Sequence, residues 1–463
     1  MGPRGPGSAA GKDPEAVRMV HVPHRFTRLA AATALALLPG LARAGTYNLT
    51  DLGSLGGTRG SGAYALSGSG IAAGYSFVQG SSFVHAMLND HGSVLDLGTL
   101  GGTQSLARAV NALGTVVGWA YPPGLAVQHA FLWRNGVMTD LGTFGGGISD
   151  AHDINDAGIV VGSAFDAQDS ERAFWWKDGV LHDVGTLGGS QSRAFAVNSQ
   201  DDIVGMAAVP SDEEFHAFLG KPGSPLYDLG TLGGPASHAY GVNERVHVCG
   251  WSMLAANSPP SRGFLWANGV MKSLGTLGGI YSAAFGLNDN DQVVGASTRA
   301  DEVQVAFLWS NDQMVELDTL LPPGTGWLLT SAWDIDEHGA IVGEGVRPDG
   351  KTRAFLLTPV ASTDVPAGGS GAELRFAGAL PNPVRDASRF AFELPRAGRA
   401  TLRLHDLSGR IVRELAAGSF AAGRQSVSWD GRDGEGARLA PGAYFARIVS
   451  DQGTRCERFV VIR

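Results

Sequence analysis

The sequence predicts an all-β protein, a seven-bladed β-propeller followed by a small β-sandwich. Three observations predict this fold class: a motif returns every 43 to 45 residues, each repeat holds four short apolar runs, and the composition changes near residue 361, where the repeat stops. Glycine accounts for 67 of the 463 residues and charged residues for only 17%, against about 7% and about 25% in average proteins. This composition suits many short strands joined by tight turns.

The repeat is marked by the phrase Asp-Leu-Gly-Thr-Leu-Gly-Gly or a close variant. Four strands in about 44 residues are typical of a propeller blade. A turn such as Asn135-Gly136 follows the third run and favours a two-residue hairpin. We expect the aspartate of each phrase to accept backbone hydrogen bonds where the chain crosses to the next repeat. The copies begin at Asp51, Asp96, Asp140, Asp183, Asp228, Ser273 and the decayed Glu316.

The first run of each repeat ends in an asparagine, or in Asp336 in the last copy. Asparagine accepts a left-handed backbone and bonds its own chain, so it should close the hairpin between the first and second strands. The asparagines are Asn111, Asn155, Asn198, Asn243 and Asn288.

The two ends of the repeat region are complementary. The region begins with an isolated strand of the fourth type, residues 46–52, and ends with a strand of the third type, residues 354–358. We therefore expect the N-terminal strand to complete the last blade and close a ring of seven, which would leave no open sheet edge.

Residues 1–44 are predicted to be a cleavable secretory signal with an upstream extension. Arg25 and Arg28 precede an apolar run over residues 29–38, and Ala42-Arg43-Ala44 fits a cleavage site. Ten apolar residues are too few to span a bilayer as a helix. The mature chain should therefore be secreted or displayed on the outer cell surface, without a transmembrane span.

Several function classes are excluded at this stage. A net charge of -9 without a basic run argues against nucleic acid as a partner. The sequence contains no phosphate-binding loop, Gly-x-Ser-x-Gly or His-Glu-x-x-His motif. The turns Asp289-Asn290-Asp291 and Asp334-Ile335-Asp336 resemble calcium loops, but both lack the remaining oxygen ligands of such a loop. We expect no cofactor, no metal site and no catalytic residue that a motif identifies.

The repeat also resembles a known family. His-Ala-Phe-Leu-Trp at residues 129–133, Asn-Gly-Val at 135–137, the Asp-Leu-Gly-Thr-Leu-Gly-Gly phrase and Ile-Asn-x-x-Gly-x-Val-Val-Gly resemble the HAF-repeat family of extracellular repeat proteins, over about residues 46–360. The resemblance implies a β-propeller-like domain, here residues 45–360, and an extracellular location. It implies no particular reaction or ligand.

A linker rich in proline, glycine and serine, residues 361–372, leads to a second domain over residues 373–463. Its short alternating strands suit a small β-sandwich. Pro381-Asn382-Pro383, Trp429-Asp430-Gly431 and Ala440-Pro441-Gly442 resemble the Ig-like C-terminal domain of flagellar hook-capping proteins and the sorting domains of type IX secretion cargo. The resemblance implies an attachment or sorting domain that engages secretion machinery, with the propeller as its cargo.

The inner strand of the repeat supplies the first set of candidate binding residues. The residue after the leading alanine is mostly a large aromatic and the next one is small, so we expect the aromatics to pack between blades. Charge breaks this pattern at Arg108, His152 and Asp153 on adjacent blades, and at Asp334 on the seventh. Because buried unpaired charges are costly, these four side chains should pair with one another or face a ligand.

The loops between the second and third strands supply the second set, because they vary most among the repeats. Loops that vary on a regular scaffold are the usual place for binding residues. Tyr75, Trp119, Tyr121 and Trp251 lie close to this rim and could stack on sugars. An extracellular glycan or protein is the partner that these features suggest.

The sequence therefore favours a secreted or surface-displayed binding or scaffold module, and leans away from an enzyme. One alternative is an extracellular carbohydrate-active hydrolase or lyase, which would need two carboxylates roughly 5 to 9.5 Å apart. Asp153 and Asp334 are the obvious pair outside the repeat pattern. A second alternative is a structural surface or adhesive protein.

Overall fold

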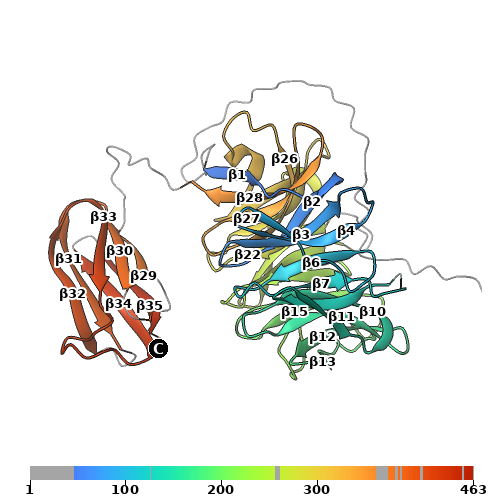
Figure 1. Cartoon of the computed structure of the whole chain (residues 1–463), viewed down its shortest axis with the longest axis horizontal. Helices are drawn as coiled ribbons and strands as arrows, with labels where there is room; N and C mark the ends of the chain where they lie inside the picture. The colour runs from blue at the N-terminus through green and yellow to red at the C-terminus, as the bar shows by residue number, and fades with distance from the viewer. Residues whose placement is uncertain are drawn as a thin grey trace, which may run out of the picture. The chain divides into compact units, whose positions relative to one another are not determined.

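The computed structural model describes residues 46–125, 127–255, 261–360, 374–380, 384–385, 388–406, 410–450 and 453–461. The chain divides into two compact units between Ala361 and Ser362. The predicted secretory signal and the predicted linker lie outside the described residues. Figure 1 shows both units and labels many of their strands. Within the described ranges, no helix has the length and apolar character needed to cross a membrane.

The first unit consists of repeated antiparallel sheets in which the strands follow chain order (Figure 1). We number these sheets along the chain. Sheet 1 contains β2 (Gly56–Leu66), β3 (Ile71–Val78), β4 (Val84–Asp90) and β5 (Ser93–Asp96); sheet 2 contains β6 (Ser105–Val110), β7 (Val116–Ala120), β8 (His129–Arg134) and β9 (Val137–Gly142); sheet 3 contains β10 (Gly145–Ile154), β11 (Val160–Asp166), β12 (Glu171–Lys177) and β13 (Val180–Asp183).

The next three sheets repeat the same four-stranded order. Sheet 4 contains β14 (Ser192–Val197), β15 (Ile203–Ala208), β16 (Phe215–Gly220) and β17 (Tyr227–Gly230); sheet 5 contains β18 (Ser237–Val242), β19 (Val248–Met253), β20 (Ser261–Ala267) and β21 (Val270–Ser273); sheet 6 contains β22 (Gly278–Leu287), β23 (Val293–Arg299), β24 (Gln304–Ser310) and β25 (Gln313–Glu316), followed by a 3-10 turn, η1 (Leu317–Leu320).

Sheet 7 combines strands from both ends of the repeat region. Its chain-consecutive strands are β26 (Leu328–Ile335), β27 (Ile341–Val346) and β28 (Thr352–Pro359). The first strand of the chain, β1 (Tyr47–Asp51), pairs antiparallel with β28, from Tyr47 opposite Pro359 to Asp51 opposite Phe355. The outer position of sheet 7 is thus taken by the N-terminal strand, as the incomplete last repeat predicts.

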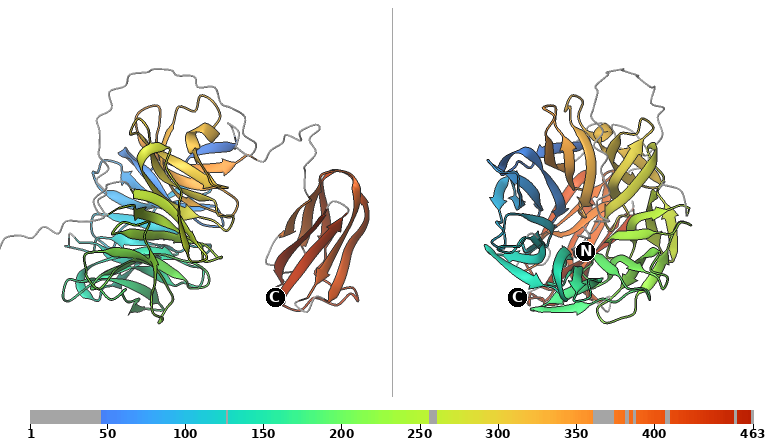
Figure 2. Two further views of the ribbon diagram at one scale, coloured as in Figure 1. Left: turned by 180° about the vertical axis from the view of Figure 1, so that it is seen from behind. Right: turned by 90° about the vertical axis from the view of Figure 1, so that its right-hand side faces the viewer.

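Each sheet packs against the next one along the chain, and sheet 1 packs against sheet 7. The inner or second strand of each sheet contacts the inner strand of the next, and β2 contacts β26, β27 and β28. In the right-hand view of Figure 2, the sheets of the first unit succeed one another in the order of their colours along the chain, and sheet 1 lies beside sheet 7. A single parallel bridge, Gly60 with Thr352, also joins β2 to β28.

The core of each sheet explains the Val-Val-Gly motif. The largest fully buried side chains include one phenylalanine on the third strand of sheets 2 to 7, and each faces the glycine of the motif on the second strand. A Cβ on Gly162, for example, would lie 2.0 Å from the Asp150 carbonyl oxygen. The phenylalanines are Phe131, Phe174, Phe218, Phe264, Phe307 and Phe355.

A buried serine at the start of most inner strands links each sheet to the one before it. Ser105 Oγ, for instance, accepts a hydrogen bond from Ala86 N at 2.8 Å. Ser61 of sheet 1 accepts one from Ala354 N of sheet 7 at 3.2 Å. The same link is made by Ser149, Ser192, Ser237 and Ser282.

The repeated asparagines differ in part from the prediction. Asn111 Oδ1 accepts the amides of its own turn, as expected, but the left-handed residue of the turn is Gly114, not the asparagine. The asparagine Nδ2 instead donates to a carbonyl of the next sheet, at 3.2 Å from Asn111 to Asn155. We call this hydrogen bond, from an asparagine Nδ2 to the turn carbonyl of the next sheet, a rung. Further rungs start from Asn155, Asn198, Asn243 and Asn288.

The outer hairpins agree with their sequence. Asn135 and Gly136 have φ values of 51° and 82°, as a type I′ turn requires. The aspartate of the repeated phrase accepts a backbone hydrogen bond at the crossover, for example from Gly142 N to Asp140 Oδ1 at 2.8 Å. His129 Nδ1 lies 2.8 Å from the other oxygen of the same carboxylate, a pairing that the sequence analysis did not anticipate.

The second unit contains two antiparallel sheets with a shared apolar core. Phe390, Trp429 and Phe459 are at most 2% exposed, and the rings of Phe390 and Phe459 lie 5.4 Å apart in an edge-to-face arrangement. The sheets are β29 (Arg375–Leu380), β30 (Ser388–Leu394) and β33 (Gly423–Trp429), and β32 (Ile411–Phe420), β31 (Gly398–His405), β34 (Gly442–Ser450) and β35 (Gly453–Val461).

Candidate functional site: a cavity lined by the inner strands

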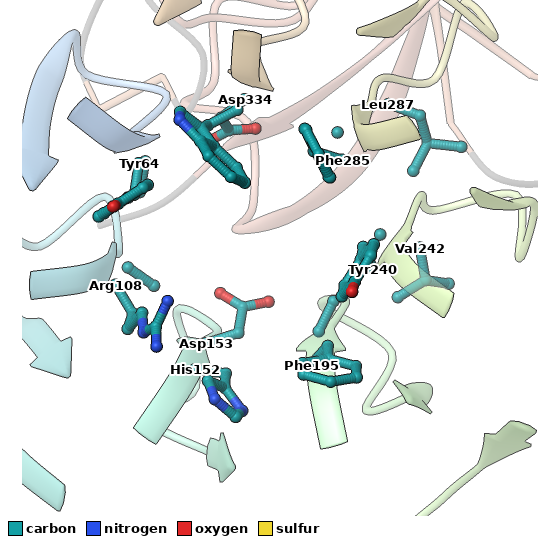
Figure 3. A pocket seen from close by; sticks show the side chains of 16 residues that line it. Tyr64, Arg108, His152, Asp153, Phe195, Tyr240, Val242, Phe285, Leu287 and Asp334 are labelled. Carbon is teal, nitrogen blue, oxygen red and sulfur yellow. The ribbon is translucent and has the colours of Figure 1, made fainter. Parts of the chain in front are cut away.

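The inner strands of the first unit surround a cavity of about 180 Å³. Figure 3 shows side chains from the inner strands pointing into it. Because each sheet contributes the residues after its leading alanine, one repeat position is displayed around the whole cavity. The lining residues are Tyr64, Ala65, Arg108, Ala109, His152, Asp153, Phe195, Ala196, Tyr240, Gly241, Val242, Phe285, Gly286, Leu287, Trp333 and Asp334.

Aromatic rings form much of the cavity wall. Phe285 stacks on Trp333 with ring centroids 4.3 Å apart, and Trp333 meets Tyr64 edge to face at 5.1 Å. On the other side, Tyr240 lies 4.9 Å from Phe195. The predicted packing of these rings between neighbouring sheets is therefore present. The same rings also line the cavity.

Arg108 and His152 share a partner that the sequence analysis missed. Arg108 Nη2 lies 3.0 Å from Asp150 Oδ2, and His152 Nε2 lies 3.4 Å from the same oxygen. Burial alone would raise the pKa of Asp150, but the neighbouring Arg108 and His152 lower it to about 2. The clue was available, since a charged Asp150 stands where sheets 1 and 2 have Gly62 and Leu106.

Asp153 and Asp334 make the same contacts in two different sheets. Asp153 accepts hydrogen bonds from Ile154 N and, across the sheet boundary, from Val197 N, both at 2.8 Å. Asp334 accepts them from Ile335 N and from Leu66 N of sheet 1, also at 2.8 Å. The prediction that these charges pair with one another is therefore not what the contacts show, because backbone amides satisfy both carboxylates.

Both carboxyl groups are nevertheless harder to ionise than usual. Burial raises the pKa of Asp153 to about 6 against the lowering effect of its amide bonds, and the charge of Asp334 adds to the rise. Burial likewise raises the pKa of Asp334 to about 6, with a further rise from Asp336. In Figure 3 both carboxylates point towards the cavity. The structure thus brings Arg108, His152, Asp153 and Asp334 to one site.

The four rim aromatics are not among the lining residues, although two of them support the wall. Tyr75 packs on Tyr64 at 5.6 Å and its hydroxyl donates to Glu344 at 3.2 Å. Trp251 donates from Nε1 to the Tyr240 hydroxyl at 3.1 Å. The remaining pair, Trp119 and Tyr121, contact each other with ring centroids 5.6 Å apart.

The acidic turns that resemble calcium loops are occupied by internal contacts. Asp336 Oδ1 accepts the amides of His338 and Ala340, and Asp291 Oδ1 lies 2.8 Å from His247 Nδ1. In the part of the chain that the structure describes, no three His, Cys, Asp or Glu side chains gather as a metal site.

Two solved structures from Porphyromonas gingivalis align with most of the chain at low similarity. PorZ, a surface component of the type IX secretion system, aligns over 86% of this chain and 59% of its own, with 12% identity and a TM-score of 0.36. Dimeric latent PorU aligns over 90% of this chain and 34% of its own, with 11% identity and a TM-score of 0.18. The chain therefore spans less than two thirds of either protein.

Sequence similarity to known proteins is found in the second unit. The basal-body rod modification proteins FlgD of Salmonella typhimurium and Salmonella typhi are each 32% identical over 77 residues, which are 16% of this chain and 33% of theirs. The chain thus matches about a third of the length of these relatives. Residues 382–454 match the family described as the FlgD Ig-like domain, so the second unit carries an Ig-like domain of the FlgD type.

Proposed function

We propose that the chain is an exported surface protein whose first unit is a closed seven-bladed propeller of the HAF-repeat type that binds a ligand in its axial cavity. Closure is supported by the pairing of β1 with β28 and by the Ser61 link from sheet 1 to sheet 7. The single observation that carries the binding function is the meeting of four polar side chains and five aromatic rings at one cavity. An extracellular glycan or protein side chain is the expected ligand.

Binding is favoured over catalysis by the state of the two cavity carboxylates. Each accepts two backbone amides, one of them from a neighbouring sheet. A nucleophile or general base has to move charge or a proton during the reaction, whereas these groups hold two sheets together. Their hydrogen bonds therefore suit a rigid binding wall better than a reacting centre.

A hydrolase or lyase of extracellular polysaccharides is the second candidate. It is supported by the raised pKa, about 6, of both Asp153 and Asp334 in the same cavity. A carboxyl group that stays partly protonated near neutral pH can act as a general acid.

The two candidates are separated by an array of glycans and extracellular protein fragments, run beside a turnover screen on polysaccharides. We expect binding without turnover, and loss of that binding in Phe285→Leu, which removes one ring from the wall. The exposed Glu213→Gln is the control and should bind normally. Turnover that disappears in Asp153→Asn or Asp334→Asn would instead establish the enzyme. Binding that survives every cavity substitution would place the ligand elsewhere.

The C-terminal Ig-like domain is proposed to serve sorting or surface attachment, on the strength of its Pro381, Trp429 and Pro441 motifs. The test is fractionation of the native host after expression of the full chain and of a chain that ends at Pro359. The full chain should reach the outer surface and be cleaved by added protease. Equal surface display of the shortened chain would overturn this role.

A further inference from the structure

The side chains at the cavity and directly behind its wall carry more negative than positive charge. The guanidinium of Arg108 is offset by Asp150 at 3.0 Å, and that carboxylate is buried behind the wall and does not line the cavity. His152 lies between the same carboxylate, 3.4 Å from its Nε2, and the Ala194 carbonyl oxygen, 2.8 Å from its Nδ1. The guanidinium and at most one imidazolium therefore stand against the three carboxylates of Asp150, Asp153 and Asp334. Asp153 and Asp334 are each bonded to uncharged backbone amides.

The aromatic part of the cavity wall also favours a positively charged ligand. Aromatic rings carry negative potential on their faces and attract cations that come within about 6 Å of the ring centre. Tyr64, Phe195, Tyr240, Phe285 and Trp333 all line the cavity. Arg108 also lines the cavity, with its guanidinium carbon 6.0 Å from the centre of the Tyr64 ring, so Tyr64 already has a cation of the protein beside it. The two carboxylates and the other four rings provide the remaining wall for a positively charged group.

The size of the cavity limits what can enter. Sites for drug-sized ligands are about 300 to 1,000 Å³, and this cavity is about 180 Å³. It therefore has room for one compact head group, with the rest of the ligand left outside.

Resting on the binding function proposed above, we infer that the cavity takes a small organic cation, an ammonium group carried either by a lysine side chain of a partner protein or by a quaternary amine. The rings and the carboxylates of Asp153 and Asp334 would hold the positive charge. The two sources share this chemistry, and the ligands of the test distinguish them.

The test is isothermal titration of the full chain at pH 7.5 with three ligands. Choline carries a quaternary ammonium, 3,3-dimethyl-1-butanol has the same shape without charge, and Nα-acetyl-lysinamide carries the side chain of a peptide lysine. We expect choline or the lysine derivative to bind at least about tenfold more tightly than the neutral alcohol, the gain typical of a desolvated cation against aromatic rings. The tighter of the two identifies the source.

Two kinds of variant locate the binding. Asp153→Asn and Asp334→Asn remove charge but keep an oxygen that accepts a backbone amide, and Phe285→Leu removes a ring but keeps an apolar side chain. All three variants should weaken binding of the cation about tenfold or more. The two asparagine variants should leave the weak binding of the neutral alcohol unchanged. Glu213→Gln removes an exposed carboxylate and should have no effect. Circular dichroism confirms that each variant is folded.

The unmodified protein supplies a measurement that needs no variant. Lowering the pH from 7.5 to 5 should weaken cation binding, because Asp153 and Asp334, whose pKa values burial raises to about 6, become protonated. The other charged or titratable groups near these two carboxyl groups are Arg108 and His152, which line the same cavity, and Asp336, which lies near Asp334.

The outcomes separate this inference from the function on which it rests. Equal affinity for choline and the neutral alcohol, with both weakened by Phe285→Leu, would overturn the cation preference and leave the cavity as the binding site. A glycan or protein ligand from the array that is lost in Phe285→Leu, together with no binding of either cation, would do the same. Cation binding that no cavity substitution weakens would overturn both.

Discussion

At the scale of single residues, Asp153 and Asp334 combine two roles. Each is an exception to a repeat position otherwise filled by Ala65, Ala109 or another small residue. A carboxylate there reaches the backbone amide of the next sheet and accepts a hydrogen bond from it. The same carboxylate gives the cavity its charge, so structure and binding depend on the same atoms.

Replacing Asp334 with alanine should destabilise the first unit. The substitution leaves Leu66 N and Ile335 N without their partner, and an unsatisfied buried amide costs about 1 to 3 kcal/mol. We expect the free energy of unfolding to fall by about this amount, measured in urea by tryptophan fluorescence. Exposed Glu213→Ala is the control and should change it by less than about 0.5 kcal/mol. A similar value for both variants would contradict the bridging role.

The stability of the first unit should depend on the pH through the same two groups. Their pKa values rise from 3.8 to about 6 in the folded protein, so folding favours the protonated form. Their stabilising contribution is present in full below about pH 4 and is lost as the pH rises through about 6.

The wild-type protein should therefore gain thermal stability between pH 7.5 and pH 4.5, relative to the Asp153→Asn/Asp334→Asn double variant. Asp318, whose pKa burial also raises to about 6, is present in both proteins and cancels. Asp150, with its pKa lowered to about 2, loses its contribution only below this range. A constant difference in melting temperature across the range would refute this linkage.

At the scale of the elements, the asparagine turns connect one sheet to the next. The Oδ1 atom closes the turn of its own sheet, and the Nδ2 atom donates to the turn of the next. Asp336 keeps the first contact in sheet 7 but has no donor for the second. The rungs therefore run from sheet 2 to sheet 7 in the described turns and stop there.

At this repeat position, a change from asparagine to aspartate and a change from aspartate to asparagine should affect the free energy of unfolding differently. Asn111→Asp keeps the turn but loses the donor to the Asn155 carbonyl, and we expect about 1 to 2 kcal/mol less stability. Asp336→Asn makes the reverse change and removes negative charge beside Asp334, so it should be neutral or slightly stabilising. Urea unfolding of both variants makes the comparison. A loss of stability in Asp336→Asn equal to that in Asn111→Asp would contradict a stabilising role of the hydrogen bond from the asparagine Nδ2 atom.

The pairs between the third and fourth strands should tolerate exchange. His129 lies beside Asp140 in sheet 2, and Arg172 lies 2.7 Å from Asp183 at the same position in sheet 3. Because exposed ion pairs contribute only about 0 to 1 kcal/mol, His129→Arg should change the free energy of unfolding by less than about 0.5 kcal/mol. A larger loss in urea unfolding would show that His129 does more than pair with Asp140.

At the scale of the whole chain, stability of the first unit depends on its two ends meeting. β1 supplies the partner strand for β28, and Tyr47 and Leu52 bury their side chains against the last sheet and the first. Without them the edge of β28 would be open, and open edges pair with other chains.

A chain that starts at Gly53 should unfold at a much lower temperature than one that starts at Gly45, and should self-associate. Each of the two lost side chains contributes about 1.5 to 3 kcal/mol of burial. Calorimetry and light scattering of the two chains measure the effect, and the melting of the second unit is the internal control. Identical melting of the first unit in both chains would contradict the role of β1.

The repeat made much of the fold predictable. Strand number, hairpin type and the pairing of β1 with the last repeat follow from local signals, such as Asn135-Gly136 and the spacing of the repeated phrase, which recur along the chain with small variations. The strand over residues 375–380 was not predicted, because its alternation is carried by alanine and glycine and gives a weak hydrophobic pattern.

The site was predicted only in part. The sequence by itself determined that Arg108, His152, Asp153 and Asp334 break the repeat, because a repeat makes every exception visible. Only the tertiary structure decided that Asp150 neutralises Arg108, that backbone amides hold the two aspartates, and that the five rings face a cavity as well as each other. These are contacts between sheets, which depend on how one sheet packs on the next, and no local pattern encodes that geometry.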